Sequence, residues 1–160
     1  MDLKKAFDTV DHQLLLTKLD YIRIRGHALE WFKSYLVKRS QIAFTNGVLS
    51  DKAILRCGVP KGWILGPLLF LIYINDLTTV ADYATVRMYA DDTNMTFTAC
   101  SIPELQHDMN IDLQFLQNWL TANTLTLNVL KTEFVLVGSR QRVATLTQEL
   151  DLSINGISLN

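Results

Sequence analysis

Two adjacent acidic residues, Asp91 and Asp92, have the clearest potential for chemistry in this sequence. They follow Tyr89 and lie between two short stretches, 86–89 and 93–98, whose residues favour strands joined by a tight turn. Neighbouring carboxylates at a turn repel each other and add nothing to a hydrophobic core. They become useful when a divalent cation lies between them and a phosphate. A solvated turn without metal is the alternative interpretation of the pair by itself.

A third acid would turn this pair into a site for two metal ions, and Asp2 is the candidate. Two Mg²⁺ ions about 4 Å apart can activate an attacking hydroxyl and stabilise a leaving pyrophosphate. Because Mg²⁺ takes hard oxygen ligands and keeps several waters, two or three carboxylates with substrate phosphates suffice. The spacing along the sequence does not tell whether Asp2 and Asp91 meet in space.

Four helices are expected around these acids. Apolar residues at helical spacing predict helices over 13–21 and 28–37. A third helix begins at Gly66-Pro67, and because it is apolar on every side through Ile74 we expect it to be buried. Ser101 and Glu104 fit a capping box that opens a long helix, whose apolar stripe is Leu105, Met109, Leu113, Leu116 and Leu120.

The remaining periodic segments predict strands over 41–45, 53–57, 133–137 and 152–157. Asn46-Gly47 marks a turn between the first two, although the connecting loop is longer than a tight hairpin requires. Helices and strands interleave without regular βαβ alternation. This order indicates an α+β fold, with one sheet and helices packed on one face, in a single domain over 1–160.

Composition narrows the class of protein. The chain has 160 residues, of which 49% are hydrophobic and 19% charged, so intrinsic disorder is excluded. Its two cysteines form no metal or disulfide pattern, which indicates a reducing intracellular location, in the nucleus or the cytoplasm. The longest apolar run, 63–74, is shorter than the roughly 20 residues of a membrane span, and no signal peptide precedes the domain, so no membrane association is expected.

Charge is distributed unevenly although the net charge is only −1. Up to Gly66 there are eleven Lys and Arg against six Asp and Glu, and after it four against ten. Such a division suits a polyanionic partner that is also bridged by metal ions. Ordinary scatter of surface charge explains the counts equally well.

Four segments, taken together, resemble the reverse transcriptase of non-long-terminal-repeat retrotransposons, with the jockey-like and related LINE elements of animals as the nearest group. They are 2–12 (DLKKAFDTVDH), 58–62 (GVPKG), 65–77 (LGPLLFLIYINDL) and 89–92 (YADD). Their order and spacing match the family, and the resemblance spans essentially the whole chain. Residues 119–132 resemble a later stretch of the same family.

The resemblance implies a polymerase palm, in which a ferredoxin-like antiparallel sheet has helices packed on one face. It implies RNA-directed DNA polymerisation, with Asp2, Asp91 and Asp92 as catalytic ligands of two Mg²⁺ ions, or of Mn²⁺ in their place. The implied partners are an RNA template, a DNA primer and deoxynucleoside triphosphates.

The same resemblance assigns contacts to nucleotide or template. It places Phe7 beneath the incoming sugar, Tyr89 against the primer end and Lys131 near the triphosphate or pyrophosphate. The loop formed by Gly58, Pro60, Lys61 and Gly62 would approach the nucleotide closely. Each assignment has a structural alternative, namely a core aromatic for Phe7, strand packing for Tyr89, a solvated Lys131 and a helix-entry turn for the loop.

The sequence departs from the family pattern at Lys61, where glutamine is usual, and at Trp63, where a small serine is usual. A charge then replaces a neutral amide, and a large ring enters a slim loop. The fingers region expected before Asp2 and the thumb expected after Asn160 are not in this sequence, which therefore reads as a partial palm.

Two other interpretations compete with polymerisation. The departures and the missing regions favour an inactive truncated relic or a domesticated nucleic-acid-binding module. Another two-metal phosphotransfer enzyme, such as a nuclease, would explain the acids but not the segment 65–77.

Overall fold

The computed structural model describes residues 1–59, 64–140, 150, 152–154 and 157–158. These residues form two compact units, one of Lys5–Asn75 and one of Met1–Lys4 with Asp76–Asn160, and each unit is described by itself. The assignment of 1–160 to a single domain stays a prediction.

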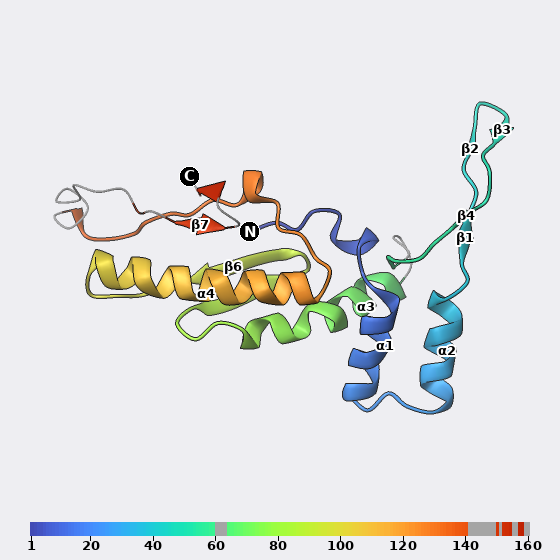
Figure 1. Ribbon diagram of the computed structural model, residues 1–160, viewed down its shortest axis with the longest axis horizontal. Helices are drawn as coiled ribbons and strands as arrows, with labels where there is room; N and C mark the ends of the chain where they lie inside the picture. Colours follow the sequence, from blue (N-terminus) through green and yellow to red (C-terminus); the bar gives the residue numbers. More distant parts are fainter. Residues whose placement is uncertain (60–63, 141–149, 151, 155–156, 159–160) are drawn as a thin grey trace. The chain divides into compact units, whose positions relative to one another are not determined.

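The unit Lys5–Asn75 is built on helices (Figure 1). They are η1 (Ala6–Asp8), α1 (His12–Tyr21), α2 (His27–Leu36) and α3 (Leu65–Ile74). Helix α1 begins where predicted because the Asp11 carboxylate accepts hydrogen bonds from the backbone N–H groups of Gln13 and Leu14. Leucines and aromatic residues from the three α-helices form the buried core of this unit, namely Leu15, Leu16, Leu19, Leu36, Leu69, Phe70 and Tyr73.

Helix α3 is buried on one face only, so the prediction of a fully buried helix was wrong. Phe70 and Tyr73 are completely buried. Leu68 and Leu71, on the other face, are 50% and 45% exposed, and Ile64 just before the helix is 94% exposed. A helix that packs through one stripe leaves the opposite stripe uncovered unless a second layer packs on it, and no described residue does so.

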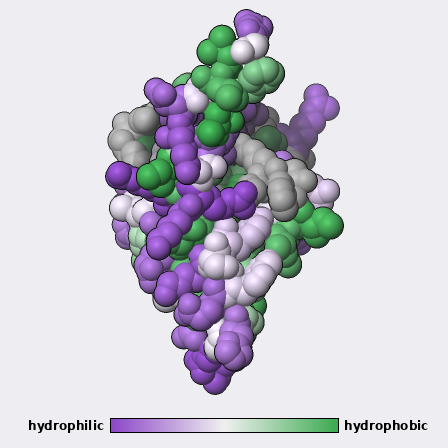
Figure 2. All heavy atoms as spheres, turned by 90° about the vertical axis from the view of Figure 1, so that its right-hand side faces the viewer, coloured by the Kyte–Doolittle hydropathy of each residue, from purple (hydrophilic) through white to green (hydrophobic). Residues whose placement is uncertain are grey.

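A narrow arm of two antiparallel chain segments, each with two short strands, extends from α2. Its strands are β1 (Ser40–Gln41), β2 (Phe44–Thr45), β3 (Val48–Leu49) and β4 (Ala53–Ile54), with β1 paired to β4 and β2 to β3, both antiparallel. The tip is a tight two-residue turn, in which Asn46 and Gly47 both have positive φ, +49° and +79°. The predicted strand 41–45 is thus divided between β1 and β2, the predicted strand 53–57 is shortened to β4, and β3 was not predicted. Phe44 and Ile54 on this arm are 70% and 71% exposed, and apolar residues are coloured green in Figure 2.

The second unit contains a hairpin, one long helix and two short terminal strands. They are β5 (Thr85–Tyr89), β6 (Asp92–Thr96), α4 (Ile102–Ala122), β7 (Ser153–Ile154) and β8 (Ile157–Ser158), with the 3₁₀ turns η2 (Asn75–Thr79) and η3 (Val129–Lys131) at the start and after α4. The predicted cap of α4 is confirmed, since Ser101 Oγ accepts a hydrogen bond from the N–H of Glu104 and Glu104 accepts one from the N–H of Cys100.

The segment Met1–Lys4 lies between β6 and residues 126–128. Met1 and Thr93 exchange two hydrogen bonds, of 2.8 and 3.1 Å. On the other side Leu3 pairs with Leu127 in an antiparallel bridge. The order across the sheet is therefore β5, β6, 1–4 and 126–128. This mixture of helices and small antiparallel strands agrees with the predicted α+β class, whereas the ferredoxin-like palm arrangement stays a prediction.

Two strand predictions near the end of the chain were wrong. Residues 133–137 form no strand, and Val135 and Val137 are 85% and 86% exposed. Strand propensity alone does not provide a backbone partner, and none of the described segments pairs with this one. Instead of one strand over 152–157, the chain forms two, β7 and β8, that pair with each other.

No helix among the described residues is long and apolar enough to cross a membrane.

Candidate active site

The acids at 91 and 92 lie at the tip of the predicted hairpin. Tyr89 pairs with Asp92, so Ala90 and Asp91 form a two-residue turn. Ala90 has a φ of +54°, a left-handed conformation that is unusual for a residue with a side chain. The hairpin prediction is confirmed, but of the two acids only Asp91 lies in the turn, because Asp92 is the first residue of β6, which ends at Thr96 and not at residue 98.

The sheet register sets Asp2 opposite Asp92. Met1 and Thr93 form the hydrogen-bonded pair of an antiparallel ladder, so one residue further the facing pair is Asp2 and Asp92. Because side chains alternate along a strand, both acids lie on the face opposite the buried Thr93 and Leu3. The structure thus brings together two acids that lie 90 positions apart in the chain.

The same face continues to Asn128. The bridge between Leu3 and Leu127 sets Asp2 opposite Asn128, with backbone hydrogen bonds from Asn128 to Asp2 and from Lys4 to Thr126, both 2.8 Å. A row of four side chains therefore crosses the sheet, namely Tyr89, Asp92, Asp2 and Asn128. The Tyr89 side chain is 86% exposed, which contradicts the alternative that it packs in the sheet.

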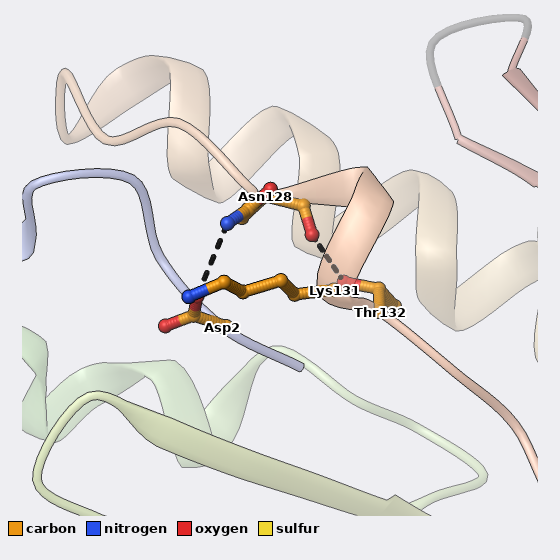
Figure 3. A network of polar contacts seen from close by, with 4 residues as sticks. All are labelled: Asp2, Asn128, Lys131 and Thr132. Atoms are coloured by element: carbon orange, nitrogen blue, oxygen red, sulfur yellow. Dashed lines mark hydrogen bonds and ion pairs between the residues drawn. The ribbon is translucent and has the colours of Figure 1, made fainter.

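Asp2 is held by the side chains of Asn128, which precedes the 3₁₀ turn η3, and of Lys131, its last residue (Figure 3). The amide nitrogen of Asn128 donates a 3.2 Å hydrogen bond to Asp2 Oδ2, and the ammonium of Lys131 lies 3.5 Å from the same oxygen. The side chains of Asp2 and Lys131 are 25% and 71% exposed. The ammonium therefore contacts a predicted metal ligand, which neither the predicted phosphate contact nor the solvated alternative anticipated.

The turn that presents these two side chains is itself anchored. The carbonyl oxygen of Asn128 accepts hydrogen bonds from the N–H of Lys131 and from the hydroxyl of buried Thr132, both 3.0 Å long. Figure 3 shows Asn128 and Lys131 approaching Asp2 from this turn. The backbone thus fixes the Cα positions of Asn128 and Lys131, and the conformation of the flexible lysine side chain determines where the ammonium lies.

The donor chemistry of this face fits Mg²⁺ or Mn²⁺. Asp2 and Asp92 supply hard carboxylate oxygens, and facing like charges destabilise a sheet unless a cation offsets them. Asp91 lies in the adjoining turn. Within the described part of the chain, however, no three His, Cys, Asp or Glu residues lie close enough to hold an ion together. The coordination of two ions by Asp2, Asp91 and Asp92 stays a prediction.

Asp112 is a supporting residue that sequence reasoning missed. It is completely buried on α4, and its carboxylate accepts hydrogen bonds of 2.9, 3.1 and 2.7 Å from the N–H groups of Asp82, Tyr83 and Ala84. These bonds tie the segment that enters β5 to the helix. The available signal was an acid at a core position of the helical stripe, beside Leu113 and one turn before Leu116.

Gly58 begins the predicted nucleotide loop and lies in the unit Lys5–Asn75. Its N–H donates to Val10 O at 2.7 Å, and its own carbonyl oxygen lies 2.8 Å from His12 Nε2. Gly58 has a φ of +88°, and a Cβ here would lie 3.0 Å from the backbone oxygen of Asp8. The local packing thus requires glycine, in agreement with the alternative interpretation of this segment as a structural turn. Pro60, Lys61, Gly62 and Trp63 lie outside the described residues.

Phe7 lies in the same unit and packs on Phe70, with ring centroids 4.5 Å apart. Its side chain is only half-buried, so a core role and a contact with a ligand are compatible. His12, which sequence reasoning did not single out, is buried beside Gly58 and helps to fix the start of the loop.

Comparison with known proteins gives one family. The family model described as reverse transcriptase (RNA-dependent DNA polymerase) matches residues 1–152. A Drosophila melanogaster protein named "Probable RNA-directed DNA polymerase from transposon BS" is 29% identical over 139 residues, which are 82% of this chain and 15% of that protein. The Drosophila melanogaster "RNA-directed DNA polymerase from mobile element jockey" is 29% identical over 130 residues, 74% of this chain and 14% of that protein. The chain thus spans about a seventh of the length of these relatives.

Proposed function

Because this chain belongs to the reverse transcriptase (RNA-dependent DNA polymerase) family, we propose that it forms the metal-binding palm of an RNA-directed DNA polymerase from a non-long-terminal-repeat retrotransposon. The opposition of Asp2 and Asp92 across one sheet face is the observation that best supports this proposal. A pair of facing acids destabilises a sheet by charge repulsion, but the same two carboxylates can bind a divalent cation.

In the proposed reaction the 3′-hydroxyl oxygen of a DNA primer forms a bond to the α-phosphorus of a deoxynucleoside triphosphate. The bond from that phosphorus to the pyrophosphate oxygen breaks, and the hydroxyl proton passes to solvent. Asp2, Asp91 and Asp92 would hold the divalent ions. These ions, Mg²⁺ or Mn²⁺, supply positive charge that favours the alkoxide and the departing pyrophosphate.

Other residues would position the substrates. Phe7, half-buried against Phe70, would offer a ring to the incoming sugar, and exposed Tyr89 would offer one to the primer end. Gly58, at the start of the proposed nucleotide loop, lies close to the backbone of Asp8, and Lys131 would provide a cation for phosphate. The RNA template and primer would be bound mainly through backbone and shape. The proposed location is the nucleus or the cytoplasm.

Primer extension tests this function. The 160-residue chain is mixed with an RNA template, a DNA primer, the four deoxynucleoside triphosphates and Mg²⁺, and it is compared with the Asp91→Ala/Asp92→Ala form. We expect extension that is lost to background in the double variant and retained in Asp108→Ala, which removes an acid on α4 away from the row. Equal extension by all three forms would overturn catalysis by these acids.

A nucleic-acid-binding module without catalysis is the second candidate, and the charge of the unit Lys5–Asn75 favours it. That unit has ten Lys and Arg against five Asp and Glu, whereas the rest of the chain has five against eleven. Binding of an RNA–DNA duplex that weakens steeply with salt, with no extension and no effect of Asp91→Ala/Asp92→Ala, would support this module over the polymerase.

A further inference from the structure

The ammonium of Lys131 lies beside the sheet face that carries Asp2 and Asp92, where a cation offsets the repulsion between the two acids. It is 3.5 Å from Asp2 Oδ2, and Asp2 faces Asp92 across the sheet. We propose that Lys131 is an internal counter-cation that competes with divalent metal ions for Asp2, so that metal binding releases its side chain. This inference rests on the proposed metal site and specifies how that site is regulated.

The contact has the properties of an exchangeable one. Lys131 is 71% exposed, and its ion pair with Asp2 is long. Exposed pairs of this kind are weak, because water screens the charges and a long side chain must be ordered. The backbone of η3 is fixed through Asn128 and Thr132, so the ammonium can leave by rotation of the lysine side chain alone.

Asp2 keeps its position when the lysine leaves. Asn128 donates to the same oxygen, Oδ2, and the backbone of Asn128 is hydrogen-bonded to that of Asp2 at 2.8 Å. A neutral amide orients the carboxylate without adding a positive charge that would repel an incoming metal ion. Asn128 is therefore a positioning residue, and Lys131 supplies a positive charge that can be removed.

The competition links two events at the site. While its ammonium contacts Asp2, Lys131 cannot also contact a phosphate that lies away from Asp2. When a divalent ion takes over the charge of Asp2, the ammonium becomes available for a polyanion such as a triphosphate. The order is then metal first and lysine–phosphate contact second.

Mn²⁺ titration followed by electron paramagnetic resonance tests the competition without any measure of activity. The 160-residue chain, Lys131→Met and Asp2→Asn are compared at physiological ionic strength, where distant exposed charges are screened. We expect Lys131→Met to bind Mn²⁺ roughly two- to fivefold more tightly, the range that an exposed ion pair can account for. Unchanged or weaker binding by Lys131→Met would overturn the proposal.

Lys4→Met is the matched control. It removes the same charge from the segment that contains Asp2, and the structure shows no ion pair between Lys4 and Asp2 among the described residues. We expect its Mn²⁺ affinity to stay close to that of the parent chain. An increase equal to that of Lys131→Met would mean a general charge effect and would also overturn the proposal.

Asp2→Asn separates failure of the inference from failure of the site. If it binds Mn²⁺ as tightly as the parent chain, the proposed metal site is wrong, and the competition is wrong with it. If Asp2→Asn loses binding while Lys131→Met matches the parent chain, only the competition is wrong. Lys131→Gln, a second neutral variant, should reproduce the result of Lys131→Met, and circular dichroism verifies that all variants are folded.

Discussion

The side-chain amide of Asn128 donates a 3.2 Å hydrogen bond to the carboxylate of Asp2 across two neighbouring segments that lie 126 positions apart in the chain. This bond fixes the orientation of an acid that faces Asp92 on the same side of the sheet. The orientation of this acid thus depends on a neutral residue.

Removal of that amide should loosen Asp2. We expect Asn128→Ala to lower the free energy of unfolding by about 1.5 kcal/mol, the usual contribution of a hydrogen bond to a charged acceptor. Mn²⁺ affinity should fall as well, because the carboxylate is no longer oriented. Asn118→Ala, at an exposed amide on α4, is the control for urea unfolding and should change stability by less than about 0.5 kcal/mol.

Asp112 should be among the most sensitive positions for stability. In Asp112→Ala three backbone N–H groups lose their acceptor, and because an unsatisfied buried group costs about 1–3 kcal/mol, we expect a total loss of about 3 kcal/mol or more. Asp108→Ala, one turn earlier on α4, should have little effect in the same urea titration. Similar midpoints for the two variants would contradict the anchoring role of Asp112.

Two glycines distinguish backbone strain from steric clash. Gly47 and Gly58 both have positive φ, but a Cβ at Gly47 meets nothing within 4 Å, whereas one at Gly58 meets the backbone of Asp8. We expect Gly47→Ala to cost about 1 kcal/mol from conformation alone. Gly58→Ala should cost more in thermal unfolding, since the backbone around Asp8 must also shift. A smaller loss at Gly58 than at Gly47 would show that this packing adapts without cost.

Ala90 holds the turn between Tyr89 and Asp92 in a left-handed conformation, with a φ of +54°. Glycine adopts this conformation without the steric penalty, although it adds entropy to the unfolded chain. We therefore expect Ala90→Gly to stabilise the chain by about 0.5 kcal/mol, the difference between the two effects. Ala84→Gly, where φ is not positive, should destabilise it, and thermal unfolding of the two variants checks the signs.

Local features of this protein could be predicted from its sequence because their causes are local. Asn-Gly encodes a turn, Ser101 and Glu104 encode the start of α4, and the alternating residues around Asp91 and Asp92 encode a hairpin. The uncovered face of α3 and the missing strand at 133–137 could not be predicted in this way. Hydrophobicity and strand propensity describe what a segment tolerates, whereas burial and pairing depend on which other segment reaches it.

The sequence by itself identified the candidate acids at 2, 91 and 92, and it indicated the family through motifs that span the chain. Only the tertiary structure decided that Asp2 faces Asp92 and Asn128 and that Lys131 lies beside Asp2. The physical reason is the nature of sheet register. It is set by backbone hydrogen bonds between distant segments, such as those of Met1 with Thr93, and no local pattern specifies them.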